Sequence, residues 1–368
     1  MNFELTDMQK TLIQSIIEFS RDEIKIDDFK NNWKKCSEYG MFKLLLPQKY
    51  GGFDLTPLDI MLITEAFGYG CQDNGFSFSI NNHLFACMIS ILLYGTDEQK
   101  EKYLVLLGEG KKIGSQAITE ECSGSNVFNM NTIAKKTDDG YILNGSKVFI
   151  SNAPIADVFI VYAKLINNSK ESICSFIVER NFDGVKIGPE IKKAGLKSCP
   201  MGELELCNCF VPMDNILGSE NNGCFVFNST MEYERSYMSA ANLGIMKRIL
   251  ENCEKFVKVK RNSGKKLIEY QSISNRIADS KVSVELSELL LYKIGWLKSN
   301  NKNAYYESSI AKLYVSESYK KLCMDAMNIH GAYGYSLESN YPKELNDAVG
   351  SCIYSGTSDI QRNIIASL

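Results

Sequence analysis

The spacing of apolar residues changes twice along the chain and divides it into three zones. In residues 1–113 apolar side chains recur with a helical period, as Leu12 and Ile16 do after the helix-start signal Thr6-Asp7. Gly51-Gly52 interrupts this zone, and a second apolar helical pattern follows. We therefore predict an N-terminal helical domain.

The middle zone, residues 114–226, has the patterns of strands. Val158–Val161 and Ser175–Val178 are short runs rich in β-branched and aromatic residues, and Glu203–Leu206 alternates polar with apolar positions. The runs are separated by turn signals at Asp139-Gly140, Asn144-Gly145 and Asp183-Gly184. This zone predicts a compact antiparallel β domain.

Helical periodicity returns in residues 227–368. One apolar stripe of a long helix is predicted from Ile273, Ile277, Val282, Leu286, Leu289 and Leu290. With Leu267 and Ile294 at its ends, this stripe offers more apolar surface than a peripheral helix needs. The chain is thus expected to be an α+β multidomain protein with the order helical, β, helical.

Composition excludes several kinds of partner. The net charge is −3 and no long basic run occurs, which argues against nucleic acid. No apolar run has the length of a membrane span, so no membrane is expected. Twelve cysteines without a secretion signal are typical of reduced thiols in the cytoplasm, and two histidines make a metal site improbable.

Five segments occur in a fixed order across nearly the whole chain. They are Leu46–Gly52, Ala117–Glu120 with Gly124-Ser125, Gly140–Asn152, Gly331–Tyr335 and Gly356–Arg362. In this order and spacing they resemble the acyl-CoA dehydrogenase family. The resemblance implies an N-terminal helical domain, a central β domain and a C-terminal four-helix bundle, with FAD as the cofactor.

The resemblance also implies which residues hold FAD. Thr119 would hydrogen-bond the isoalloxazine ring, Ser125 would approach the ribityl chain or pyrophosphate, and Ser151 would reach N5. Phe149 stands where the family commonly has tryptophan and would pack on the ring, and Thr357 of the last segment joins this set. Taken singly, such residues are more often ordinary turn and core residues.

A second group corresponds to family positions that hold the adenosine half of FAD on a neighbouring chain. It comprises Lys260, Gln271, Asn328 and Gly331. Lys260 stands in place of an arginine and loses its bidentate fork, and Ser263 replaces a phenylalanine. Asn346-Asp347 likewise replaces the family's usual Arg-Asp.

The catalytic base is absent from its usual position. Most of the family has Glu-Gly-Thr near the C-terminus, whereas this chain has Ser355-Gly356-Thr357, and a serine hydroxyl is too weak a base. The isovaleryl and long-chain members carry the base on an earlier helix. In that register Glu234 is the base, with Arg235 beside it and Glu232 as the rival.

Ser355 and Gly356 still have a predicted role in substrate binding. In the family the backbone N–H at the Ser355 position donates to the substrate carbonyl, and a changed side chain leaves that group in place. We therefore expect Ser355 to contribute its backbone N–H alone, beside Gly356 and Arg235.

These observations predict a flavin-dependent dehydrogenase of an acyl thioester carried on coenzyme A or an acyl carrier protein, in specialised biosynthesis as readily as in fatty-acid oxidation. Its electron acceptor would be an electron-transfer flavoprotein or oxygen, and it would assemble as a homodimer or homotetramer. One alternative is a flavin monooxygenase of the same fold, which needs no α-proton base. Another is a flavin-free, non-catalytic assembly subunit.

Overall fold

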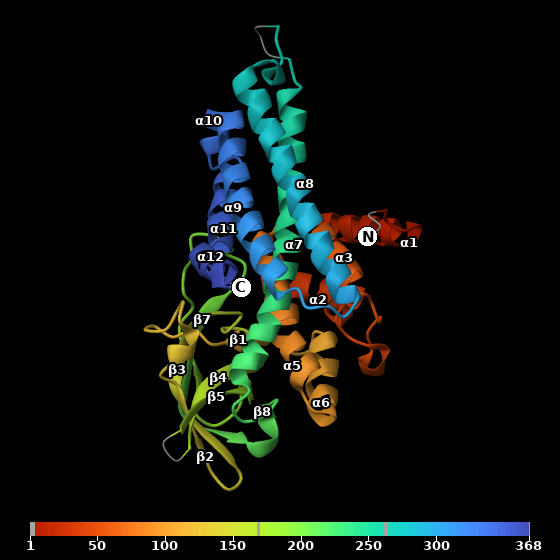
Figure 1. Cartoon of the computed structure of the whole chain (residues 1–368). Helices are drawn as coiled ribbons and strands as arrows, with labels where there is room; N and C mark the ends of the chain where they lie inside the picture. Colours follow the sequence, from red (N-terminus) through yellow and green to blue (C-terminus); the bar gives the residue numbers. More distant parts are fainter. Residues whose placement is uncertain (1–3, 168–169, 261–263, 368) are drawn as a thin grey trace.

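The computed structural model describes residues 4–167, 170–260 and 264–367, and it shows helices at both ends of the chain around a β domain (Figure 1). The N-terminal part contains α1 (Asp7–Asp22), α2 (Phe29–Tyr39), α3 (Pro57–Gly70), α4 (Asn74–Asn82), a π-helical turn η3 (His83–Met88), α5 (Ile89–Tyr94) and α6 (Asp97–Gly108). Short 3-10 turns, η1 (Met41–Lys43) and η2 (Gln48–Tyr50), connect α2 to α3.

Three of these helices begin with the same capping arrangement. Thr6, Thr56 and Thr96 are the N-caps of α1, α3 and α6, and each forms a capping box with the third helical residue. The box satisfies backbone N–H groups that have no partner inside the helix. The helix start predicted at Thr6-Asp7 is therefore confirmed.

The helical stretch Asn74–Tyr94, which comprises α4, η3 and α5, is long and apolar enough to cross a membrane by composition alone. However, 83% of its most apolar window is buried inside the protein. That burial is the pattern of a core helix.

The β domain is one sheet with the order β6-β7-β3-β2-β4-β5-β8, and β1 pairs with β4 outside this path. Its strands are β1 (Gly114–Ala117), β2 (Ile133–Lys136), β3 (Gly140–Ser151), β4 (Val158–Asn167), β5 (Lys170–Glu179), β6 (Val185–Ile187), β7 (Met201–Pro212) and β8 (Ile216–Leu217). The predicted strand runs lie in β4, β5 and β7. Strand β4 pairs in parallel with both β1 and β2, so the sheet is mixed rather than purely antiparallel as expected.

One predicted turn is wrong. Asn144-Gly145 lies inside β3, where the pairing with β7 shifts register between Leu143 and Gly145. Gly145 has a φ of +148°, and a Cβ there would meet Thr132. The glycine thus permits a β-bulge rather than a chain reversal.

The C-terminal part is built on three long helices, α7 (Gly223–Val257), α8 (Gln271–Ser299) and α9 (Tyr305–His330), which run side by side in Figure 1. Three shorter helices pack on α9, namely α10 (Ala332–Tyr335), α11 (Tyr341–Ser351) and α12 (Ser358–Ser367). The first half of α7 lies beside the β domain, and its other end lies far from that domain (Figure 1).

The two helical parts share one hydrophobic core, which also takes in one face of the β sheet through Val158, Ile160 and Tyr162. The other face of the sheet has a core of its own. Helix α3 lies so close to α7 that a Cβ on Gly68 would fall 2.2 Å from the carbonyl oxygen of Ala241. A Cβ on Gly244 would likewise fall 2.0 Å from the carbonyl oxygen of Glu65. This close approach fixes α7 on the N-terminal helices.

The predicted single stripe on α8 is two separate faces. Ile277 and Ile294 are buried against the bundle, whereas Val282, Leu286 and Leu289 are 57%, 43% and 40% exposed. Their i, i+4, i+7 spacing places these three exposed residues on one side of the helix. We call them the α8 outer face.

Candidate active site

A cavity of about 650 Å³ lies between the β domain, the first half of α7 and the segment that joins α11 to α12. Its volume is within the range of sites that hold cofactors and small ligands. Nine of the predicted site residues line it: Thr119, Ser125, Phe149, Ser151, Glu234, Arg235, Ser355, Gly356 and Thr357. Residues as far apart as β1 and α12 therefore converge on one site.

Phe149 has two unusual properties for a large apolar residue in a strand. It is 57% exposed, and its φ is +59°, a conformation that non-glycine residues seldom adopt. It sits where the β3–β7 register shifts between Lys147 and Ile150. A bulge that turns an aromatic ring toward a cavity is a feature of functional sites, because the surrounding fold must offset the backbone strain.

The loop after β1 is fixed to β3 by a buried ion pair. Lys147 Nζ lies 2.8 Å from Glu120 Oε1, and both side chains are buried. Glu120 also accepts a hydrogen bond from the backbone N–H of Thr132 at 2.9 Å. The backbone N–H of Val148 donates to the carbonyl oxygen of Thr119 at 2.9 Å. Lys147 was missed by the sequence reasoning, although a lysine within an apolar strand is itself a signal of a buried ion pair.

These residues fit a flavin. The exposed ring of Phe149 offers an apolar wall, and Thr119 and Ser151 add polar side chains to the lining of the same cavity. Thr119 and Ser151 are partly buried, whereas Ser125 is exposed. When bound, FAD would supply a hydride acceptor in this cavity.

Glu234 is the carboxylate that α7 places in the cavity. It is 7% exposed; its Oε1 accepts a hydrogen bond from the Ser355 hydroxyl at 2.5 Å, and its Oε2 is buried without a partner in the described chain. Burial raises the pKa of Glu234 to about 7, against the opposing effects of the Ser355 hydrogen bond and the Arg235 charge. A carboxyl group with a pKa in this range is suited to take up a proton at neutral pH.

Glu232, the rival, does not line the cavity. Its Oε1 lies 2.8 Å from Lys298 Nζ and accepts a hydrogen bond from the backbone N–H of Ala304 at 3.0 Å. Glu232 therefore links α7 to the α8–α9 connection, and the structure gives it a structural role.

Ser355 and Gly356 form a turn with both residues at positive φ, +55° and +88°. Arg235 Nε donates to the carbonyl oxygen of Ser355 at 3.2 Å, and Gln361 Nε2 donates to the same oxygen at 3.1 Å. Gln361 also donates to the carbonyl oxygen of Gly356 at 3.0 Å. The predicted substrate residue Arg235 therefore has a visible function in holding this turn.

The second predicted cofactor group lies elsewhere. Lys260, Gln271, Asn328 and Gly331 are exposed and do not line the cavity, and Ser263 lies outside the described residues. The helical path from Glu234 to the end of α7 is about 35 Å long at 1.5 Å per residue. Lys260 follows the end of α7, Gln271 begins α8, and Asn328 and Gly331 lie at the end of α9. We call these four residues the distal group.

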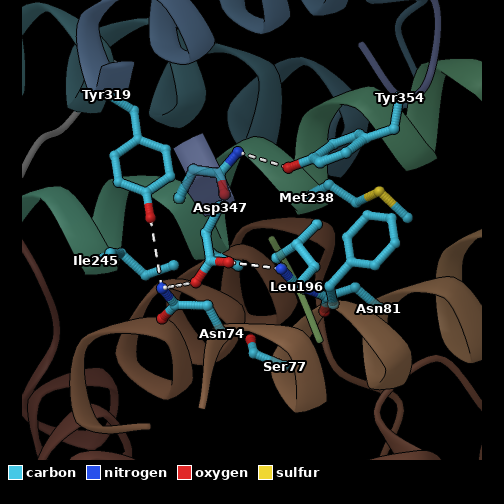
Figure 2. A pocket seen from close by; sticks show the side chains of 12 residues that line it. Asn74, Ser77, Asn81, Leu196, Met238, Ile245, Tyr319, Asp347 and Tyr354 are labelled. Carbon is cyan, nitrogen blue, oxygen red and sulfur yellow. Dashed lines mark hydrogen bonds between the residues drawn. The ribbon is translucent and has the colours of Figure 1, made fainter. Parts of the chain in front are cut away.

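A second pocket, of about 10 Å³, adjoins the cavity (Figure 2). Phe78, Leu196 and Tyr354 line both pockets. The Tyr354 hydroxyl accepts a hydrogen bond from Asn242 Nδ2 at 2.9 Å, and the rings of Phe78 and Tyr354 are 4.6 Å apart. This volume holds about one water molecule. The cavity is thus closed at its inner end by Phe78, Leu196 and Tyr354, which we call the inner wall.

The polar side of the small pocket is tightly connected. Asp347 accepts hydrogen bonds from the backbone N–H of Leu196 at 2.5 Å and from Asn74 Nδ2 at 3.0 Å, as Figure 2 shows. Burial raises the pKa of Asp347 to about 6. Polar groups, rather than an apolar channel, therefore lie behind the inner wall.

Comparisons with known proteins agree along the whole chain. Models of the N-terminal, middle and C-terminal domains of acyl-CoA dehydrogenases match residues 6–111, 115–209 and 221–367. The chain belongs to the acyl-CoA dehydrogenase family. The predicted family, fold class, FAD cofactor and activity are confirmed, so the chain is an FAD-dependent dehydrogenase of acyl thioesters.

Individual members of the family resemble the chain over its full length. An L-prolyl-[peptidyl-carrier protein] dehydrogenase of Serratia sp. is 35% identical over 100% of this chain and 97% of that protein. The crystal structure of the prolyl acyl carrier protein oxidase AnaB has a TM-score of 0.95 at 38% identity, with 99% of each chain covered. The FAD complex of PigA has a TM-score of 0.95 at 35% identity, covering 100% of this chain and 98% of that one.

Proposed function

We propose that this dehydrogenase oxidises an L-prolyl group held as a thioester on a peptidyl carrier protein, as a step in specialised biosynthesis. The named relatives that resemble it over their full lengths act on prolyl carrier-protein thioesters. The observation that carries the proposal is the buried Glu234 carboxylate, which lines the cavity together with the flavin loops and has one oxygen without a partner in the described chain. Our proposal assigns Glu234 as the catalytic base.

The reaction needs a base because the hydrogen on the carbon beside a thioester is only weakly acidic. Glu234 Oε2 would take the α-hydrogen as a proton, and FAD bound beside Phe149, Thr119 and Ser151 would supply the acceptor for the β-hydrogen. The product would be a ring with a double bond between Cα and Cβ. A flavin monooxygenase of the same fold has no use for this base, so Glu234 favours the dehydrogenase.

The turn at Ser355-Gly356 would bind the thioester carbonyl. Negative charge grows on that oxygen as the α-proton leaves, and a backbone N–H aimed at it stabilises the charge. The side chains of Arg235 and Gln361 hold the turn by donating hydrogen bonds to its carbonyl oxygens. The Ser355 N–H is therefore presented by a rigid segment.

The inner wall favours a compact acyl group. A long apolar chain that passed Glu234 would meet Phe78 and Tyr354. Behind them lies only about 10 Å³ of space, lined by polar side chains together with Met238, Ala241 and Ile245. A five-membered ring needs no deeper channel. The shape of the cavity thus agrees with a prolyl substrate better than with a fatty acyl chain.

The experiment is anaerobic flavin bleaching of the holoenzyme with a panel of thioesters. Prolyl carrier protein should reduce the flavin fully, prolyl-CoA more slowly, and octanoyl-CoA hardly at all. Faster bleaching by octanoyl-CoA than by the prolyl thioesters would contradict the proposed substrate. Readmission of air, with and without an electron-transfer flavoprotein, then distinguishes oxygen from a protein acceptor.

We propose further that the enzyme is a homodimer or homotetramer. The α8 outer face leaves three large apolar side chains exposed, and the distal group is too far from the cavity to serve it within one chain. A neighbouring copy could bury the α8 outer face and bind its own FAD partly through the distal group. Light scattering of the holoenzyme should therefore give two or four times the mass of the chain.

A cytoplasmic location is part of the same proposal. All twelve cysteines lie within the described residues, and each is a free thiol. Reduced thiols are typical of the cytoplasm.

A further inference from the structure

The hydroxyl group of Ser355 makes an unexpected contact for a residue thought to act through its backbone. It donates a hydrogen bond to Glu234 Oε1 at 2.5 Å, across 121 residues of sequence. The other carboxylate oxygen, Oε2, has no partner in the described chain. One oxygen of Glu234 is therefore held by Ser355, and the other is buried without a partner among the described residues.

Ser355 is itself held in a conformation that favours glycine. Its φ of +55° is seldom adopted by a residue with a Cβ, and the hydrogen bonds from Arg235 and Gln361 to its carbonyl oxygen maintain it. Arg235 is held in turn by Ser309 Oγ, at 3.4 Å, and by the ring of Tyr305. This brace keeps the side chain of Ser355 pointing at Glu234.

We propose that Ser355 is a positioning residue for Glu234, whose hydroxyl fixes the carboxylate so that Oε2 faces the α-hydrogen of the substrate. The inference rests on the proposed function of Glu234 as the base. It revises the expectation that Ser355 acts through its backbone alone. It also explains a serine at the position where most relatives carry the base: a second carboxylate there would repel Glu234, whereas a hydroxyl donates to it.

The proposal predicts how the ionisation of Glu234 depends on Ser355. A hydrogen bond donated to a carboxylate stabilises its charged form, so loss of the hydroxyl raises the pKa of Glu234 above its value of about 7. The other titratable groups that interact with Glu234 are Arg235, Tyr162 and Tyr354. Burial raises the pKa values of both tyrosines above their usual range, so they stay neutral near pH 7.

The test measures single-turnover flavin reduction against pH in Ser355→Ala and Ser355→Gly. Both variants lack the hydroxyl, but only glycine also relieves the backbone strain of the positive φ. If Ser355 affected Glu234 through backbone geometry alone, the two variants would therefore have different midpoints. We expect the midpoint of the acid limb to rise by about one pH unit in both, which makes reduction about tenfold slower at pH 6. An unchanged midpoint in both variants would overturn the proposal.

The matched control is Ser287→Ala, which removes a buried hydroxyl that donates to the carbonyl oxygen of Ser283 on α8. It should leave the midpoint where it is. The pKa of Glu234 can also be measured without substrate, by following its infrared carboxyl band in the holoenzyme against pH. The band is assigned to Glu234 by its disappearance in Glu234→Gln. If this band titrates higher in the Ser355 variants but no thioester reduces the flavin, the positioning role stands and the proposed reaction fails. If reduction requires Glu234 but neither midpoint moves, the positioning role fails alone.

Discussion

The cavity is formed by residues of one chain, whereas the distal group is a set of exposed residues that lie away from it. Around the cavity, residues from β1, β3, α7 and the α11–α12 segment converge, and the predicted base has a defined partner and a free oxygen. The distal residues Lys260, Gln271, Asn328 and Gly331 are exposed at the far end of the bundle (Figure 1). The groups proposed for the reaction therefore lie within one chain, whereas the proposed site for the adenosine end of FAD requires a second copy.

The largest expected effect comes from Glu234→Gln. Glutamine keeps the size of the side chain but cannot take up the proton, so flavin reduction should slow by about 10²- to 10⁴-fold while flavin binding persists. Stopped-flow absorbance of the holoenzyme with prolyl carrier protein measures this. Glu232→Gln, two residues away on the same helix, is the control: it should reduce at the normal rate and lose about 1 kcal/mol of unfolding free energy. Equal rates in the two variants would remove Glu234 from the mechanism.

A smaller effect is expected from the flavin loops. Replacing Thr119 by Val and Ser151 by Ala removes two hydroxyl groups from the cavity lining. At about 1 kcal/mol per lost hydrogen bond, FAD should bind about 30-fold more weakly, as measured by titration of the apoprotein. The double variant Thr137→Val with Ser172→Ala changes the same chemistry elsewhere in the β domain and should bind normally. Wild-type affinity in the first pair would show that the loops do not hold the flavin.

The smallest effect is expected at the distal group, because an exposed charge contributes little. Lys260→Ala should weaken FAD binding by about fivefold at most, and only in the assembled oligomer. Lys30→Ala, an exposed lysine on α2, provides the comparison. A monomer that retains full FAD occupancy would contradict the shared site, whatever the effect of Lys260.

Much of the fold is encoded locally and could be predicted. Capping threonines, alternating strands and the Asp183-Gly184 turn signal are each local features of the sequence. The predictions are wrong where contacts with residues distant in the sequence determine the local structure. Asn144-Gly145 resembles a hairpin turn but becomes a bulge because β7 pairs along both sides of it. The apolar residues of α8 form two faces because the bundle covers Ile277 and Ile294 but leaves Val282 exposed.

The site shows the same division. The candidate residues were predictable because each lies in a family-like motif, and the missing carboxylate at Ser355 directed attention to Glu234. The hydrogen bond between these two side chains was not predictable, because it joins residues 121 apart through the packing of α7 against the α11–α12 segment. The inner wall also depends on tertiary packing, since Phe78, Leu196 and Tyr354 come from three separate regions.

Glu234 is the proposed base, and its burial raises its pKa to about 7. The most direct measurement is the pH dependence of single-turnover flavin reduction by the wild-type holoenzyme, between about pH 5 and 9. Because only the ionised carboxylate accepts the α-proton, the rate should rise with pH, reach half its maximum near pH 7 and be about tenfold below its plateau at pH 6. This limb should vanish from the residual activity of Glu234→Gln. A flat profile in the wild type, or the same limb in Glu234→Gln, would contradict the assignment.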